Sequence, residues 1–379
     1  MSGSKVPEQV ATEASFEFKA TPSEIAGNPW LPDMPATRFL KNALTLVLSV
    51  VLCLGSAEIV LRAFTHGDTY LDPRKAAFWQ YRQQLNPAGN PVARDLVLDD
   101  VLGWRMKPGY ESRGVRHNSA GFRGAEEFSM RPSKFRVLTI GDSMTYGLGV
   151  SDDETFSAHL QRLTGHEVIN AGVNGYGVDQ ALLMWERYGI GYAPDVVVLG
   201  YFVDDFHRNG LSMREWRKPH FAYNAGTDRI ELHAPVESRA LHAGTPAGVL
   251  VGSRLFQALA WAWHKTRTKL GLVADQDMLR KARLSDLILA RLKESVVQNS
   301  ARLLVVFFGH RQDGNVANAW IESSLMQSCR AVGVDCVNMA EAFRQVDYSA
   351  EFYGTNYHFS AFGHQFIANE IAKSLGAGR

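Results

Sequence analysis

Hydrophobic positions divide the chain into three kinds of segment. Residues 1–37 are polar, mixed in charge and rich in proline, which is typical of a flexible tail. No charge occurs from Ala43 to Ala57, and the apolar character resumes at Ile59 before it ends at Arg62. From Phe135 onward, short apolar runs alternate with helical periodicity. This alternation predicts an α/β fold.

The apolar segment at residues 38–63 nearly matches the roughly 20 residues that a membrane-spanning helix needs. The alternative is a buried core helix, and in a span Glu58 would have to lie near an interface or pair with another group. We favour a single-pass membrane anchor, because the run stands alone between polar segments and no small-residue cleavage signal follows it. Basic residues flank both ends and do not decide the orientation. We expect the tail in the cytoplasm and the catalytic bulk in the periplasm or another extracytoplasmic space.

Five short runs rich in β-branched and aromatic residues are predicted to be buried strands of one parallel sheet. They are Phe135–Ile140, Glu167–Asn170, Asp195–Gly200, Leu303–Phe308 and Asp335–Asn338. Between them, apolar residues at helical spacing predict core-facing helices. These residues are Phe156, Leu160 and Leu163, then Leu284, Leu287, Ile288, Leu292 and Val296, and finally Ile367, Ile371 and Leu375.

The predicted domain organisation follows from these segments. Residues 64–134 form a lead-in segment whose GWRMKPG and HNSAGFRG stretches suggest turns. Residues 135–379 form the main domain. The stretch at residues 209–275 interrupts the alternation with a hairpin-like piece, HFAYNAGTDRIEL, and an aromatic-rich helix carrying Trp261 and Trp263. We interpret it as an insertion beside the site.

Composition and charge exclude several classes of protein. The 40 basic and 39 acidic residues nearly cancel, and no Lys/Arg-rich run suits a nucleic acid partner. Of the three cysteines, Cys53 lies in the apolar run, and no Cys/His spacing predicts a metal site. Cys329 and Cys336 bracket a short turn and are close enough to form a disulfide outside the cytoplasm, although two free core thiols are equally compatible with the sequence.

Residues that directly follow the strands carry the candidate chemistry, because ligands of open parallel sheets bind beyond the carboxyl ends of the strands. The first strand is followed by Gly-Asp-Ser with Ser143, the second by NAGVNG and the third by YFVDD. A serine needs a base within hydrogen-bond reach. Among the 12 histidines, His358 fits best, because it lies in a loop just before the last helix.

Four sequence blocks, taken together and in their order along the chain, are more specific than any one of these motifs. VLTIGDSMTYG, VINAGVNGYG, VVVLGYFVDD and NYHFSAFGH resemble the blocks of the SGNH (GDSL) hydrolases over about residues 135–379. The chain also resembles bacterial, membrane-anchored members of that family. The resemblance implies a flavodoxin-like three-layer α/β/α sandwich with a central parallel five-stranded sheet. It implies no cofactor.

The family's roles transfer to matching positions. The resemblance implies that Ser143 is the nucleophile and donates its backbone N–H to the oxyanion hole, that Gly175 supplies a second donor, and that His358 is the general base. Asp142 is expected to cap backbone N–H groups. His364 is expected to be structural, and His310 could line the pocket.

Two positions depart from the family pattern. The oxyanion hole usually includes an Asn where this chain has Asp204, and an ionised carboxylate cannot donate. Either Asp204 is protonated, or Asn174 or Asn209 substitutes, or the activity is weak. The residue that orients the base is usually Asp, but here it is Asn356, which stabilises an imidazolium less well. The acid would then come from elsewhere, with Asp204 or Asp205 the first candidates and Asp347 and Glu351 after them.

The leading functional prediction is a serine esterase acting on an acyl ester of an envelope glycan or lipid. The same acyl-enzyme would serve an O-acyltransferase of an extracellular polysaccharide, in which a sugar hydroxyl replaces water. A catalytically weak binding or assembly protein is the third hypothesis, because two family positions are changed. The sequence does not specify an oligomeric state.

Overall fold

The computed structural model describes residues 36–64, 95–212, 214, 218–235, 253, 255, 258–259, 262–263, 266, 274–309, 316–346, 351–354 and 358–376. The chain divides into two compact units, Met1–Leu61 and Arg62–Arg379.

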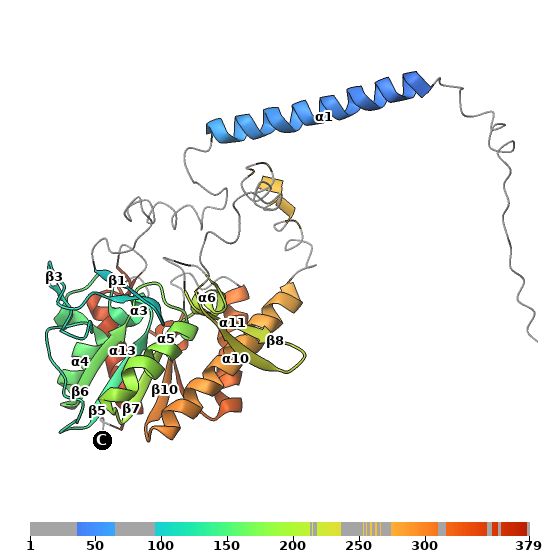
Figure 1. Cartoon of the computed structure of the whole chain (residues 1–379). Helices are drawn as coiled ribbons and strands as arrows, with labels where there is room; N and C mark the ends of the chain where they lie inside the picture. Colours follow the sequence, from blue (N-terminus) through green and yellow to red (C-terminus); the bar gives the residue numbers. More distant parts are fainter. Residues whose placement is uncertain are drawn as a thin grey trace, which may run out of the picture. The chain divides into compact units, whose positions relative to one another are not determined.

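Helix α1 (Ala36–Phe64) contains the apolar run predicted from the sequence (Figure 1). Its Leu40–Leu61 stretch of 22 residues is long and apolar enough to cross a membrane, and none of it is buried in the structure. The hydroxyls of Thr45 and Ser49 donate to carbonyls one turn earlier in the helix, each over 2.8 Å. Because these hydroxyls are satisfied inside the helix, they impose little cost on a hydrocarbon environment.

Five parallel strands form the central sheet, as predicted. They are β5 (Arg136–Gly141), β6 (Glu167–Gly172), β7 (Val196–Phe202), β10 (Arg302–Phe308) and β11 (Asp335–Asn338). Their spatial order is β11-β10-β7-β5-β6. The first strand in the sequence, β5, therefore lies between the second and the third, which is the flavodoxin-like order. Every residue of β5 and β7 is buried, as strands covered on both faces should be.

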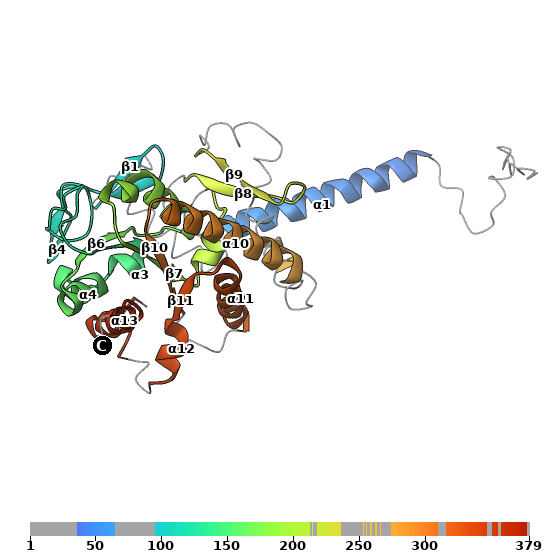
Figure 2. The same ribbon diagram turned by 90° about the horizontal axis from the view of Figure 1, so that it is seen from below.

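Helices cover both faces of this sheet (Figure 2). Helices α4 (Phe156–Thr164) and α13 (Ala361–Ser374) pack against each other on one face. On the other face, α10 (Ala274–Gln298) contacts both α5 (Val178–Met184) and α11 (Val316–Val332). The arrangement is the three-layer α/β/α sandwich that the family resemblance implied.

The core-facing stripes predicted on the helices are largely correct. Phe156, Leu160, Ile288 and Ile367 are each fully buried. The prediction that Leu163 faces the core is wrong, because this residue is 51% exposed near the end of α4. This helix has only nine residues and ends at Thr164, directly after Leu163, so helical spacing alone overestimates the buried stripe.

Shorter elements complete the described part of the chain. They are β1 (Leu96–Asp99), β2 (Gly103–Met106), β3 (Glu111–Ser112), β4 (Val115–Arg116), α3 (Ser143–Tyr146), a 3₁₀ turn at Asp152–Glu154, a π turn at Trp185–Gly189, a 3₁₀ turn at Ile190–Tyr192, α6 (Asp205–Arg208), β8 (His220–Asn224), β9 (Arg229–His233) and α12 (Met339–Arg344). The hairpin expected in the insertion is β8 paired antiparallel with β9. Trp261 of the expected aromatic helix lies outside the described residues.

The lead-in segment contributes to the core of the main domain. Leu102, Trp104 and Phe122 are buried in the same hydrophobic cluster as the sheet. His117 donates through Nδ1 to the Lys107 carbonyl at 2.8 Å, which leaves Nε2 to accept the Tyr146 hydroxyl at 2.8 Å. The described part of this segment, from residue 95 onward, is therefore packed onto the sheet.

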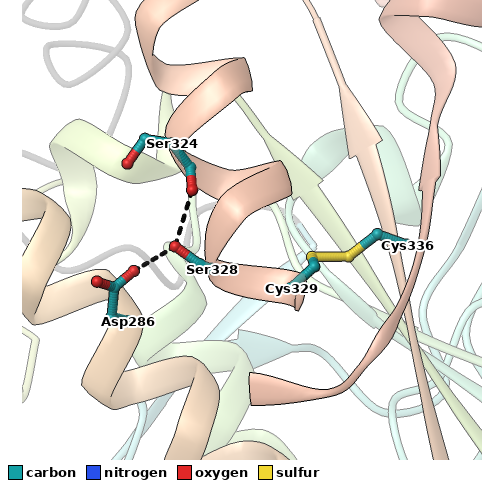
Figure 3. Close-up of a disulfide and its surroundings, with 5 residues drawn as sticks. All are labelled: Asp286, Ser324, Ser328, Cys329 and Cys336. Atoms are coloured by element: carbon teal, nitrogen blue, oxygen red, sulfur yellow. Dashed lines mark hydrogen bonds between the residues drawn. A yellow bond between two sulfur atoms is a disulfide. The ribbon is translucent and has the colours of Figure 1, made fainter. Parts of the chain in front are cut away.

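Cys329 near the end of α11 and Cys336 in β11 form a disulfide (Figure 3). Their Cα atoms are 6.3 Å apart, and the sequence separation is 7 residues. Of the two alternatives that the sequence allowed, the structure contains the bridge. Beside it, the Ser328 hydroxyl shares its single proton between the Ser324 carbonyl oxygen, 2.9 Å away, and the Asp286 carboxylate.

Reduction of this disulfide is expected to lower the free energy of unfolding by about 2–3 kcal/mol, because the bridge closes a short loop in the unfolded chain. Urea unfolding of the full chain in detergent, with and without dithiothreitol, measures the difference. The Cys329→Ser/Cys336→Ser variant should have the same free energy of unfolding as the reduced protein, and dithiothreitol should not change it. Equal stability of the oxidised and reduced wild type would contradict this prediction.

Candidate active site

Ser143 begins helix α3 immediately after the buried strand β5. Asp142 caps this helix, as predicted, because its Oδ1 accepts the Met144 N–H at 2.9 Å. Gly141 has a φ of +150°, and a Cβ there would lie 2.6 Å from the Gly200 carbonyl oxygen. Only glycine therefore lets the chain turn so closely over β7. The turn holds the Ser143 side chain, 8% exposed, at the carboxyl edge of the sheet.

His358 approaches the same edge from the far end of the sequence. Its Nε2 lies 2.9 Å from Ser143 Oγ, across a sequence separation of 215 residues. The backbone fixes this position, because the His358 carbonyl accepts the Gly354 N–H at 2.7 Å and Phe359 pairs with Tyr353. Ser360 then caps α13. A neutral imidazole at this distance is placed to take the hydroxyl proton.

The loop after β6 makes a tight turn from Val173 to Tyr176. The Tyr176 N–H donates to the Val173 carbonyl at 3.3 Å, and Gly175 has a φ of +83°. Asn174 does not have a positive φ, so the turn is type II, which needs glycine at its third position. The start of the turn is tied to the end of β5, just before Ser143, since the Val173 N–H donates to the Gly141 carbonyl at 3.0 Å.

Several backbone N–H groups in these loops have no acceptor among the described residues. They include those of Ser143, at the first position of α3, and Gly175, in the type II turn. Unpaired amides at a strand-end loop are suited to a developing negative charge on an oxygen atom. The arrangement therefore combines a serine, a histidine and backbone N–H groups that have no acceptor among the described residues.

Arg208 of α6 connects three of the strand-end loops beneath this site. Its Nη1 lies 2.7 Å from Asp142 Oδ2, 2.8 Å from Asp205 Oδ1 and 3.0 Å from the Tyr176 carbonyl oxygen. The other oxygen of Asp205 accepts the Phe202 N–H at 3.0 Å. Asp142, Asp205 and Arg208 are all buried.

Two carboxylates share this one cation. Burial, together with the negative charge of Asp142, raises the pKa of the Asp205 carboxyl well above its usual range, and Arg208 works against that rise. Burial alone would lower the pKa of the Arg208 guanidinium, but Asp205 and Asp142 outweigh it and keep that pKa raised. Arg208 is therefore a permanent cation at the base of the site.

Several residues proposed from the sequence are occupied elsewhere. Both oxygens of Asp205 are engaged by Arg208 and Phe202, so this carboxylate is not available to orient His358. The Asn209 amide has one of its two donors engaged, since it donates to Ser285 Oγ at 3.0 Å. The Asn174 amide points to Asp95 at 3.4 Å.

Asp204 differs from its buried neighbour. Its side chain is 44% exposed and lies 3.9 Å from Arg208 Nη2. Asn356, Asp347 and His310 lie outside the described residues, so their predicted roles stay predictions. Glu351 is exposed in the loop before His358.

His364 has the structural role expected of it. It is 1% exposed, and its Nδ1 accepts the Phe156 N–H at 3.1 Å, which ties α13 to α4. Burial lowers the pKa of His364 to about 3, so the ring is neutral and can accept this hydrogen bond.

The GDSL-like lipase/acylhydrolase family model matches residues 139–366 of the chain, from β5 to α13. The chain therefore belongs to this family and is an enzyme of the SGNH/GDSL serine hydrolase type. The matched region contains the Gly-Asp-Ser turn, the type II turn and His358. No curated protein matches the chain in sequence.

Solved structures that are similar to the chain include the following three. LAE5, an alpha/beta hydrolase enzyme from the metagenome of Lake Arreo, Spain, shares 13% identity, with a TM-score of 0.41 over 66% of this chain and 99% of its own. TesA shares 13% identity, with a TM-score of 0.39 over 63% and 97%. Axe2, an acetylxylan esterase from Geobacillus stearothermophilus, shares 13% identity, with a TM-score of 0.39 over 65% and 96%. The family assignment rests on the sequence match and not on these distant likenesses.

Sequence reasoning missed two buried residues that contact the strand-end loops. Arg208 follows the YFVDD block by three residues, and a basic residue one turn after two acidic ones was the available signal. Trp104 lies in GWRMKPG, a stretch interpreted only as a turn. Its burial depends on tertiary packing and leaves no local pattern.

Proposed function

We propose that the chain is a membrane-anchored serine esterase that uses Ser143 as nucleophile and His358 as general base. The observation that carries the proposal is the 2.9 Å hydrogen bond between Ser143 Oγ and His358 Nε2 at the carboxyl edge of the sheet. The two backbone N–H groups of Ser143 and Gly175, without acceptors among the described residues, support it.

The reaction proceeds through an acyl-enzyme. Ser143 Oγ attacks the ester carbonyl carbon while His358 Nε2 takes the hydroxyl proton. The carbonyl oxygen becomes an oxyanion, which accepts hydrogen bonds from the N–H groups of Ser143 and Gly175. The ester C–O bond then breaks, and the leaving alcohol takes the proton from His358. Water repeats the sequence on the acyl-enzyme and releases the acid.

Asn356 is proposed to orient His358 through the second ring nitrogen. An amide oxygen can accept the Nδ1–H, although it stabilises the imidazolium less than a carboxylate does. A modest turnover on simple esters is therefore expected of this enzyme.

Asp204 is proposed to occupy the third oxyanion position. A carboxylate there repels the oxyanion, whereas an amide would donate to it, so Asp204→Asn is expected to raise kcat by about 10–100-fold. The rate of p-nitrophenyl acetate hydrolysis by the full chain in detergent measures this. Asp228→Asn is the control, because Asp228 is an exposed hairpin carboxylate paired with Arg283. A decrease after Asp204→Asn would instead assign this carboxylate to His358.

The substrate is proposed to be an acyl ester of an envelope glycan or lipid. The apolar stretch Leu40–Leu61 would hold the domain at a membrane surface. The Cys329–Cys336 disulfide supports an extracytoplasmic domain, because such bridges persist in oxidising compartments. An O-acyltransferase would share the acyl-enzyme, and product analysis with an added polysaccharide acceptor separates acyl transfer from hydrolysis.

Covalent labelling tests the nucleophile directly. Full-length protein in detergent is treated with a fluorophosphonate probe and analysed by peptide mass spectrometry. We expect one adduct, on Ser143 of the native protein, and none after denaturation, because activation needs the folded His358. Ser157→Ala, which removes a buried serine hydroxyl bonded to Thr139, should label normally. Absence of an adduct, or an adduct elsewhere, would refute the proposal.

A further inference from the structure

Trp104 reaches from the lead-in segment to the turn that carries Gly175. The residue lies in β2 and is fully buried. Its indole Nε1 donates to the Asn174 carbonyl oxygen at 2.9 Å, across 70 residues of sequence. This carbonyl belongs to the peptide unit whose N–H is that of Gly175.

The hydrogen bond decides which way the Gly175 N–H points. In a trans peptide the C=O and the N–H point in opposite directions from one plane. Type I and type II turns differ mainly by a rotation of their central peptide by about 150–180°, and the ends of the turn stay in place. Here the central peptide joins Asn174 and Gly175, so the two turn types direct the Gly175 N–H to opposite sides.

Both ends of the turn are fixed to the surroundings of Ser143. The Val173 N–H donates to the Gly141 carbonyl at 3.0 Å, and the Tyr176 carbonyl accepts from Arg208 at 3.0 Å. Only the central peptide is left free to rotate. The Trp104 indole holds the carbonyl of this peptide, so the Gly175 N–H of the same peptide points the opposite way.

Tyr176, at the end of the turn, also contacts Trp104 and helps to fix the position of the indole. The Tyr176 hydroxyl donates to the Trp104 carbonyl, and the two rings meet edge to face with centroids 5.6 Å apart. The neighbouring Leu102 carbonyl accepts the Gln180 amide at 2.8 Å. The β1–β2 hairpin is thus attached to the turn itself and to Gln180 in the helix that follows it.

We propose that Trp104 is a positioning residue that keeps the Gly175 N–H directed at the oxyanion, so that the lead-in segment completes the active site. The inference rests on the proposed function, because it assigns the donor role to Gly175. Without the indole N–H, the central peptide can rotate and the donor is lost for part of the time.

Trp104→Phe tests this. It keeps an aromatic side chain and removes the donor, so kcat for p-nitrophenyl acetate should fall about 10–100-fold. KM should change less than about twofold, because the oxyanion exists only in the transition state. Steady-state kinetics of the full chain in detergent measures both parameters.

Trp185→Phe is the matched control. Trp185 is also fully buried, and its Nε1 donates to Ser295 Oγ at 3.0 Å, so the substitution removes an equivalent hydrogen bond from the packed core. Both variants should lose similar thermal stability. Only Trp104→Phe should lose kcat.

A second pair of variants covers the case in which phenylalanine prevents folding. Benzothienylalanine, a tryptophan isostere with sulfur in place of the N–H, is incorporated at position 104 or at position 185. A loss of kcat at position 104 alone supports the proposal. A kcat within about twofold of wild type in the folded position-104 variant overturns it. Wild-type protein without Ser143-dependent turnover would instead overturn the proposed function, and the inference with it.

Discussion

Replacing Ser143 with alanine is expected to lower kcat for p-nitrophenyl acetate by about 10⁴–10⁶-fold, because the acyl-enzyme cannot form. Among the described residues, this hydroxyl forms a hydrogen bond with His358, so its removal should have little effect on the rest of the structure. We expect the free energy of unfolding to stay within about 1 kcal/mol of wild type. Steady-state kinetics and urea unfolding of the full chain in detergent measure the two quantities.

The His358→Ala variant and the double variant sharpen this test. Residues that act as one unit are not additive, so Ser143→Ala/His358→Ala should be no slower than either single variant. Ser157→Ala, a buried serine bonded to Thr139 at 3.1 Å, should keep kcat within about twofold. If Ser143→Ala retained the wild-type rate, nucleophilic catalysis by this serine would be wrong for that ester.

Strand positions could be predicted because burial on both faces leaves a local signature. The run Asp335–Asn338 is a strand with the predicted ends, and the other four predicted strands differ from the observed ones by one or two residues. Helical stripes were predicted less well, as Leu163 shows, because spacing does not record where a helix leaves the core.

The pairing of Ser143 with His358 could be expected only from four ordered blocks. Nothing local in either residue encodes a contact over 215 positions, whereas the block order and the carboxyl-edge rule for parallel sheets predict one edge for both. The positioning residues left no such signal. Trp104 acts through its indole N–H on a carbonyl 70 residues away, and only the folded chain brings the two together.

Asp205 shows the limit of reasoning from residue type. From the sequence, Asp205 was a candidate for the acid that orients His358, because Asn356 stands where the family usually has an Asp. In the structure its oxygens are bound to Arg208 Nη1 at 2.8 Å and to the Phe202 N–H at 3.0 Å. A basic residue three positions later thus converts a candidate catalytic carboxylate into part of the support for the site.

Arg208→Met is expected to lower the free energy of unfolding by about 3–5 kcal/mol near pH 8. Methionine keeps most of the aliphatic length, but Asp142 and Asp205 are left as two buried carboxylates without a cation, with side chains 0% and 1% exposed. Arg302→Met is the control, because the Arg302–Asp335 pair is about half exposed and should contribute less than about 1 kcal/mol.

The loss should depend on pH in a defined direction. The pKa of Asp205 is already raised in the folded protein above its ordinary value of 3.8, and removal of Arg208 raises it further. Folded Arg208→Met therefore binds a proton at pH values where the unfolded chain does not, so its stability falls as the pH rises through that window. Urea unfolding at about pH 5 and about pH 8 should show a larger deficit at the higher pH.

The Arg208→Met/Asp205→Asn variant separates charge from packing. It removes one uncompensated carboxylate, so it should recover part of the lost stability and reduce the pH dependence. A deficit equal at both pH values, and unchanged by Asp205→Asn, would mean that Arg208 stabilises the fold mainly through its hydrogen bond to the Tyr176 carbonyl. Because that bond also holds the end of the Gly175 turn, either result specifies how α6 supports the catalytic edge.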